Sequence, residues 1–186
     1  PNIDFAQLHT VLRTPELLHR WLPLVEGSDM IELLGPTTSI IKTRFRLGWP
    51  ASPRDAILLT HAMESSDTVV YLATSVPWSR DAPSYLRPAP PYVRAHVGLF
   101  AVVAQYDGSK VLLTAYWSWN PKVAWLATRG GGIHASLAVS LQYIDTFVSE
   151  HGSMIASLAA FGPSLEFAPV QFIEARDTLR MQYVVL

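Results

Sequence analysis

The chain of 186 residues is long enough for one domain with a sizeable core and too short for two ordinary domains. Hydrophobic residues make up 49% of it and charged residues only 16%, which excludes a disordered chain. The 14 basic and 15 acidic residues give a net charge of -1, and the basic residues are scattered, so we expect no nucleic-acid partner. The absence of cysteine excludes disulfides and thiolate metal sites.

Two short helices followed by a run of strands are predicted for the first two thirds of the chain. Apolar residues spaced three and four apart from Phe5 to Val25 predict the helices, the second with Pro15 in its first turn. β-branched and aromatic runs separated by turn residues then predict a mostly antiparallel meander. The prolines of Pro77–Pro91 predict a long surface loop within it. The strands are expected at Met30–Leu34, Ser39–Trp49, Asp55–Met63, Thr68–Val76, Val93–Gln105 and Val111–Trp119.

One long amphipathic helix is predicted near the end of the chain. An apolar stripe at helical spacing runs from Ile133 to His151, with Gly130–Gly132 before it and Gly152 as its predicted end. Met154–Ala160 predicts a further turn or two, and Val170–Val185 predicts a hairpin.

This order of elements predicts an α+β fold in which a curved antiparallel β-sheet grips a long C-terminal helix. In several strands the odd-numbered and the even-numbered residues are both apolar, so both faces of the strand are apolar. A sheet with one face in water needs only one apolar face. An internal apolar cavity lined by side chains explains this pattern, and so does an outer face covered by another segment.

Three short segments carry a resemblance to a known family. Residues 16–32 read ELLHRWLPLVEGSDMIE, residues 49–55 read WPASPRD, and residues 120–126 read NPKVAWL. In this order and spacing, roughly four fifths of the chain, from Phe5 to Gly152, resembles the START, or StAR-related lipid-transfer, domain family and its helix-grip fold. The sequence departs from the family pattern at Asn120, where Asp is usual, at Val123, where Gly is usual, and in the family's opening helix and first strands, which find no match.

The resemblance implies that the chain binds one lipid of the sterol or phospholipid class in an internal cavity and transfers or senses it between membranes, without enzymatic activity or a cofactor. It implies a cytoplasmic protein with transient, peripheral contact to membrane surfaces. The longest apolar run, Val97–Ala104, has 8 residues, whereas a membrane span needs about 20. We expect residues 1–152 to form the lipid-binding domain and residues 153–186 a C-terminal extension packed on it, within a larger multidomain protein.

Candidate ligand contacts follow from the expected cavity. Some sterol-binding members of the family carry a buried acidic and a buried basic side chain in the pocket, and the equivalent positions here are Ile41 and Thr60. The resemblance therefore implies a nearly apolar pocket with hydroxyls to orient one polar head. We expect Gly130–Gly132 to act as a hinge and the Ile133–Val148 helix as a lid. The expected ligand-binding residues are Ile41, Phe45, Leu58, Thr60, Leu72, His96, Phe100, Tyr116, Trp125, Leu137, Leu141 and Ile144.

Two other classes of function stay open. A protein-interaction or regulatory module with this fold would have its cavity filled by large side chains that meet across the sheet. A helix-grip enzyme acting on a hydrophobic small molecule would need two polar side chains converging in the cavity, for instance His96 with Tyr116. The six histidines have no metal-ligand spacing, so no metal site and no catalytic residue is predicted.

Two further groups of residues have both a structural and a functional interpretation. Arg54 and Asp55 are expected to form an ion pair that fixes the start of a strand, rather than a catalytic pair. Trp117, Trp119 and Trp125 are expected in the core, and an aromatic cage for a choline head is the alternative.

Overall fold

The computed structural model describes the backbone of residues 5–47, 50–77, 83–122 and 131–161, and their side chains except at residues 85, 131–138 and 159–161. The helical elements are α1 (Phe5–Arg13), η1 (Pro15–Leu17), α2 (Leu18–Trp21), η2 (Ser84–Leu86) and α4 (Gly131–Phe161). The strands are β1 (Val25–Gly35), β2 (Thr38–Phe45), β3 (Arg54–Glu64), β4 (Thr68–Ser75), β5 (Val93–Arg94), β6 (His96–Tyr106) and β7 (Val111–Asn120). The two predicted helices are present, and β1 begins earlier than expected. Of the predicted loop after β4, residues 78–82 lie outside the described residues, and the described remainder contains η2.

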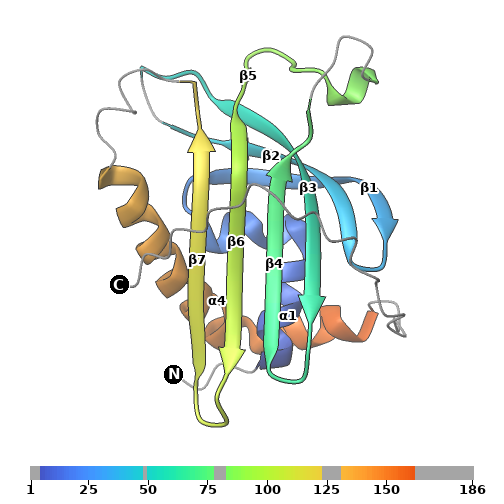
Figure 1. Cartoon of the computed structure of the whole chain (residues 1–186), viewed down its shortest axis with the longest axis vertical. Helices are drawn as coiled ribbons and strands as arrows, with labels where there is room; N and C mark the ends of the chain where they lie inside the picture. The colour runs from blue at the N-terminus through green and yellow to red at the C-terminus, as the bar shows by residue number, and fades with distance from the viewer. Residues whose placement is uncertain (1–4, 48–49, 78–82, 123–130, 162–186) are drawn as a thin grey trace, which may run out of the picture.

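The strands form one curved sheet of 7 strands in the order β1-β2-β3-β4-β6-β7, all neighbours antiparallel, with β5 parallel beside β3. α1, α2 and α4 lie together on one face of this sheet, behind the long strands in the view of Figure 1. The predicted α+β helix-grip fold is therefore confirmed. Within the described ranges, no helix is both long enough and apolar enough to cross a membrane.

β2 shows how the residue pattern sets the two faces of the sheet. Ile41, Thr43 and Phe45 are buried, whereas the intervening Lys42 and Arg44 are only partly buried. Side chains alternate between the faces along a strand, so the first three residues face the helices and the basic residues face outward. The predicted half-buried strand with a basic outer face is confirmed up to Phe45, where β2 ends; Trp49, its predicted last residue, lies outside the described residues.

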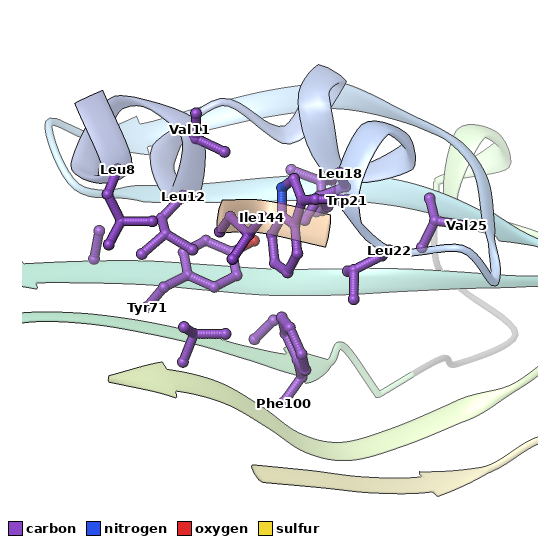
Figure 2. Packing of buried hydrophobic residues seen from close by; sticks show 14 of the residues in the cluster. Leu8, Val11, Leu12, Leu18, Trp21, Leu22, Val25, Tyr71, Phe100 and Ile144 are labelled. Atoms are coloured by element: carbon purple, nitrogen blue, oxygen red, sulfur yellow. The ribbon is translucent and has the colours of Figure 1, made fainter. Parts of the chain in front are cut away.

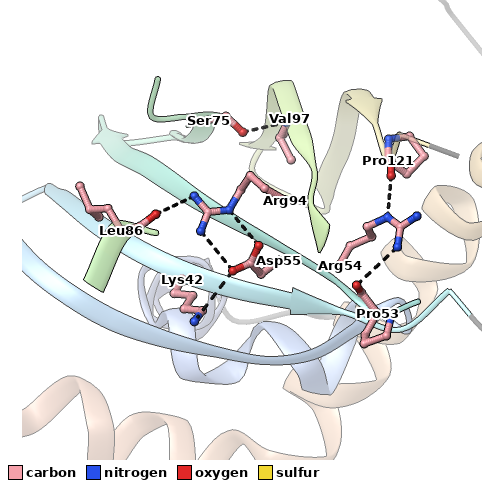
Figure 3. A network of polar contacts seen from close by, with 9 residues as sticks. All are labelled: Lys42, Pro53, Arg54, Asp55, Ser75, Leu86, Arg94, Val97 and Pro121. Atoms are coloured by element: carbon pink, nitrogen blue, oxygen red, sulfur yellow. Dashed lines mark hydrogen bonds and ion pairs between the residues drawn. The ribbon is translucent and has the colours of Figure 1, made fainter. Parts of the chain in front are cut away.

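A buried ion-pair network holds the segment from η2 to β5 against the outer face of β3 (Figure 3). Asp55 is fully buried, and its carboxylate accepts hydrogen bonds from Arg94 at 2.8 and 3.2 Å. Lys42 Nζ lies 3.9 Å from the same carboxylate, and Arg94 also donates to the Leu86 carbonyl oxygen at 2.9 Å. Ile57 points to this outer face and is buried against Leu86 and Arg94. A covered outer face therefore explains why β3 is apolar at both parities.

The predicted ion pair between Arg54 and Asp55 is wrong, because adjacent residues of a strand point to opposite faces. Arg54 instead donates from Nε to the Pro121 carbonyl oxygen at 2.7 Å and from Nη1 to the Ser52 carbonyl oxygen at 2.6 Å. Burial lowers the pKa of the Arg54 guanidinium. Arg54 thus ties the start of β3 to the turn after β7, as Figure 3 shows.

The turn after β7 forms with asparagine at position 120. Asn120 Oδ1 accepts a hydrogen bond from the Lys122 backbone N–H at 2.9 Å, as an aspartate oxygen would. Lys122 has a positive φ of 54°. Val123, the other departure in this turn, lies outside the described residues.

The run expected as one strand, Val93–Gln105, is divided at Ala95 into β5 and β6. The prediction of a single strand is wrong here, because β5 leaves the meander to pair with β3. β6 also contains a register shift opposite β7 between Val97 and Leu99. A bulge of this kind places an extra residue on one strand, and Val97 and Phe100 are accordingly both buried on the helix-facing side.

α4 continues through the predicted helix end at Gly152 and reaches Phe161. The backbone is non-helical at His151, with φ -119° and ψ 20°, so the helix is kinked there. A Cβ atom at position 152 would lie 2.9 Å from Gln7 Oε1 of α1, so Gly152 permits a close approach of the two helices rather than ending one of them. Ile155, beyond the kink, is fully buried. The predicted further turns are therefore the last part of α4.

The interior between helices and sheet contains an aliphatic and an aromatic group of buried residues, called here its aliphatic end and its aromatic end, and Figure 2 shows some residues of each. In that view, side chains of α1 and α2 point toward Tyr71 and Phe100 of the sheet. The aliphatic end consists of fully buried residues of α1 and α4, namely Leu8, Val11, Leu12, Ile144, Val148 and Ile155. The aromatic end consists of Trp21, Phe45, Tyr71, Phe100, Trp117 and Trp119.

Candidate ligand cavity

A cavity lies at the aromatic end, where α2 and the start of β1 face the sheet. The side chains leave about 20 Å³ of free space in it, enough for about one ordered water molecule. Ligand pockets commonly measure roughly 300–1,000 Å³, so the space present is far smaller than a lipid needs. The cavity is lined by Leu18, Leu22, Val25, Thr43, Phe45, Leu58, Tyr71, Ala73, Val97, Phe100 and Trp117.

Aromatic rings from β2, β4, β6 and β7 meet along one side of this cavity. The centroid of the Phe100 ring lies 6.1 Å from that of Tyr71 and 5.4 Å from that of Trp117. Trp119 continues the series, with its ring centroid 5.4 Å from Trp117 and 5.2 Å from Phe45. Trp117 and Trp119 pack against the core, as expected from the sequence. Large side chains therefore meet across the sheet and narrow the cavity, the feature expected of a filled interior.

Several hydrogen-bond donors at the aromatic end are buried without a partner among the described residues. Burial raises the pKa of the Tyr71 hydroxyl, so it stays protonated at neutral pH, and a hydrogen-bond interaction with the Thr60 side chain opposes this rise. Thr60 Oγ1 itself lies 2.7 Å from Ser39 Oγ and donates to the Ser39 carbonyl oxygen at 3.2 Å. The donors without a partner are the indole N–H groups of Trp21, Trp117 and Trp119.

The lining that the structure describes contains no acidic or basic side chain. Its other polar residue, Thr43, is hydrogen-bonded to Ser28, with 3.0 Å between the hydroxyl oxygens. Asp145 of α4 has a buried carboxylate oxygen without a partner among the described residues, but it does not line the cavity. No group of three or more metal-ligand side chains occurs in the described ranges. Because burying an unpaired charge is costly, the cavity suits an uncharged part of a ligand.

The predicted ligand-binding residues fall into separate groups. Leu141 is partly buried on α4, Trp125 lies outside the described residues, and so does the side chain of Leu137. Those that line the cavity are Phe45, Leu58 and Phe100. Those buried in the same interior but outside the lining are Ile41, Thr60 and Ile144.

The prediction that Leu72, His96 and Tyr116 face the cavity is wrong. Tyr71 and Ala73 line the cavity, so Leu72 between them points to the opposite face of the sheet. Tyr116 is 49% exposed, because the other parity of β7 faces the core. His96 is exposed at the start of β6. His96 and Tyr116 therefore do not form the polar pair inside the cavity that an enzyme would need.

The remaining lining residues were missed by the sequence-based prediction. For β7 a signal was present, because the polar residues Thr114, Ser118 and Asn120 share one parity and leave the other to Trp117. For β4 no such signal exists, because both parities are apolar and the pattern does not say which side Tyr71 faces. The missed residues are Leu18, Leu22, Val25, Thr43, Tyr71, Ala73, Val97 and Trp117.

The expected hinge and lid lie at the border of the described residues. α4 begins at Gly131, and Gly130 is not among the described residues. The roles of Gly130–Gly132 as hinge and of Ile133–Val148 as lid stay predictions. The hairpin predicted at Val170–Val185 lies outside the described residues as well.

Comparison with known proteins gives a similarity in fold. No family model and no curated protein matches the chain. Human STARD10 is similar in structure, with a TM-score of 0.67 and 18% identity over 84% of this chain and 63% of that one. Human StAR-related lipid transfer protein 5 has a TM-score of 0.68 and 17% identity, over 81% of this chain and 73% of its own. A STAR-related lipid transfer protein from Xanthomonas axonopodis has a TM-score of 0.57 and 18% identity, over 77% of this chain and 78% of its own.

These similarities show that the chain has a START-like fold, as the motifs near Trp49 and Asn120 indicated. The chain spans less than two thirds of the length of the STARD10 chain.

Proposed function

We propose that this chain binds one lipid molecule, of the sterol or phospholipid class, in the candidate cavity and transfers or senses it between membranes. The observation that carries the proposal is an internal space without acidic or basic lining residues at the aromatic end of a START-like fold. Proteins of similar fold are named lipid transfer proteins. We propose a cytoplasmic, non-catalytic carrier that contacts membrane surfaces transiently and belongs to a larger protein.

The energetics of binding do not require a charged partner. Each buried CH2 group of a ligand contributes about 0.8 kcal/mol, so a sterol-sized apolar body supplies useful affinity on its own. The cavity has room for about one water molecule, so its wall has to move outward before a lipid can enter. We propose that the Ile133–Val148 part of α4 provides this movement as a lid.

Ile155 is fully buried in the core, which extends the proposed lipid-binding unit past residue 152. We therefore propose that the unit includes the whole of α4 and that the C-terminal extension begins after Phe161.

The proposal is tested by incubating the purified protein with vesicles of phosphatidylcholine and cholesterol, re-isolating it and identifying bound lipid by mass spectrometry. We expect one lipid per chain. Tyr116→Ala is the control for the outer face, because its side chain is 49% exposed and away from the cavity, and it should carry the same lipid. Protein that returns from the vesicles without lipid would contradict the proposal.

A protein-interaction or regulatory module with a filled cavity is the second candidate function. The ring contacts between Phe100, Trp117 and Trp119 favour it, because they occupy much of the space at the aromatic end. This candidate predicts that no lipid is taken from the vesicles and that stability does not change in their presence. The same incubation therefore separates the two candidates.

A further inference from the structure

The kink at His151 divides α4 into two parts that are attached to different elements. The short part after the kink is fixed to α1, because Gly152 lies against Gln7 and Ile155 is fully buried. α4 also contacts α2 and β7. Figure 1 shows the long part before the kink, residues 131–150, beginning at the level of the upper end of β7, far from the end of the helix beside α1.

The backbone at the kink suits a hinge. His151 has non-helical dihedral angles, and Gly152, the residue type with the widest range of backbone angles, follows it directly. The His151 ring donates from Nδ1 to the Phe147 carbonyl oxygen at 3.2 Å and stacks on the Phe147 ring, with 4.7 Å between the centroids. Both contacts lie within one turn of α4, so they do not tie the kink to the sheet. A hinge needs a few residues that absorb changes in φ and ψ, and His151 and Gly152 supply them.

The length of the first part of α4 converts a small rotation at the hinge into a large displacement at its beginning. With a rise of 1.5 Å per residue, its roughly 20 residues span about 30 Å. A rotation of about 10° therefore moves the beginning of the helix by about 5 Å and Val148, next to the hinge, by less than about 1 Å. The aliphatic end around Val148 stays packed during such a rotation.

This rotation acts on the candidate cavity through α2. Leu18 of α2 and Leu22 directly after it line the cavity, and α4 packs against α2. None of the α4 side chains that the structure describes lines the cavity, so this helix supports the wall from behind. When the first part of α4 moves away, Leu18 and Leu22 lose this support and can move outward, which enlarges the space for a ligand.

We propose that α4 opens by rotation about a hinge at His151 and Gly152, while the part after the kink stays fixed on α1. This inference rests on the lipid-binding function proposed above. It places the hinge at the opposite end of the lid from Gly130–Gly132, the hinge expected from the sequence. The aromatic end opens and the aliphatic end stays packed, so a ligand enters without loss of the core that stabilises the fold.

The test uses single cysteines, which report on one position each because the chain contains no cysteine of its own. Ser140→Cys lies in the moving part, Val148→Cys next to the hinge and Ile155→Cys in the fixed part, and all three positions are at most 2% exposed. Each protein is incubated with and without vesicles of phosphatidylcholine and cholesterol. The rate of labelling by a maleimide and the amount of bound lipid are measured by mass spectrometry in the same samples.

Vesicles are expected to raise the labelling rate of Ser140→Cys by roughly fivefold or more and to leave Val148→Cys and Ile155→Cys as slow as in buffer. Slow labelling in buffer also shows that each variant is folded. Gly152→Ala restricts the hinge and is expected to reduce the increase at Ser140→Cys by roughly two- to fivefold. This comparison is made with Gln7→Ala in both proteins, because the added Cβ would otherwise lie 2.9 Å from Gln7 Oε1.

Three results would overturn the inference while leaving the lipid-binding function intact, each with lipid bound: a Ser140→Cys that stays protected, equal acceleration of all three cysteines, or an increase that Gly152→Ala leaves unchanged. Equal acceleration would mean that α4 detaches as a whole. Absence of bound lipid from the parent chain would overturn the lipid-binding function and this inference with it.

Discussion

The two ends of the interior are built from different residues and differ in whether they border the candidate cavity. At the aliphatic end, α1 and α4 bring Leu8, Leu12 and Ile144 together at 0% exposure, and none of these three lines the cavity. At the aromatic end, Tyr71 and Trp117 border the narrow cavity, and the Trp117 indole N–H has no partner among the described residues. Close packing of the first kind stabilises a fold, whereas space and unpaired polar groups lower stability and serve binding.

The first prediction concerns leucine truncation at each end. Leu12→Ala should lower the free energy of unfolding by about 3–5 kcal/mol, because a fully buried side chain is lost from a packed site. Leu58→Ala should cost less, about 2–3 kcal/mol, because Leu58 already borders free space and makes fewer contacts. Urea denaturation of both variants measures the difference. Equal decreases in the free energy of unfolding for the two variants would contradict the proposed difference between the two ends.

The second prediction compares an alanine outside the candidate cavity with one in its lining. Ala62→Leu should lower the free energy of unfolding by about 1–3 kcal/mol, because Ala62 is buried in the core outside the cavity and overpacking strains its neighbours. Ala73→Leu should lower it by less than Ala62→Leu does, because Ala73 lines the cavity and its free space takes part of the added volume. Denaturation curves of the two variants decide, and a strongly destabilised Ala73→Leu would mean that the aromatic end is already fully packed.

The third prediction concerns pH: stability should depend on pH through His9 of α1, whereas lipid uptake at the aromatic end should not. His9 of α1 lies 3.1 Å from Glu64, and burial lowers its pKa from 6.5, with Glu64 acting against this shift and Arg13 adding to it. A lowered folded-state pKa means that protonation favours the unfolded chain, so stability should fall as pH drops below 6.5 toward the folded-state pKa.

Comparing His9→Gln with the parent chain between pH 7 and pH 5 measures this contribution as the difference in pH dependence of unfolding. Lipid uptake should not follow the same profile, because the described cavity lining has no side chain that titrates in this range. A pH-dependent uptake that His9→Gln leaves unchanged would place a titrating group at the aromatic end and contradict the description of that end.

The sequence predicted the fold well because its strongest signals are local. The alternation around Lys42, the turn prolines and the helical stripe ending in Val148 each report on one element, and the motifs near Trp49 and Asn120 set the order of the elements. Gly152 was read as a helix end because its close approach to Gln7 of α1 is a tertiary contact that no local pattern contains.

The candidate cavity was predicted less well, because it depends on which parity of each strand faces the helices. On β7 the polar residues of one parity could have excluded Tyr116, but on β4 both Tyr71 and Leu72 suit either face. On β6 the register shift after Val97 changes which residues of the strand, odd- or even-numbered, face the helices. No residue pattern in the sequence predicts this shift.

The central claim is that the space at the aromatic end holds a lipid, and native mass spectrometry of the parent chain and Ala73→Leu tests it most directly. Both proteins are incubated with vesicles of phosphatidylcholine and cholesterol and measured after re-isolation. The account predicts one lipid bound to the parent chain and none to Ala73→Leu, with a cooperative thermal unfolding transition for both proteins. Equal lipid occupancy of both proteins, or none in either, would contradict it.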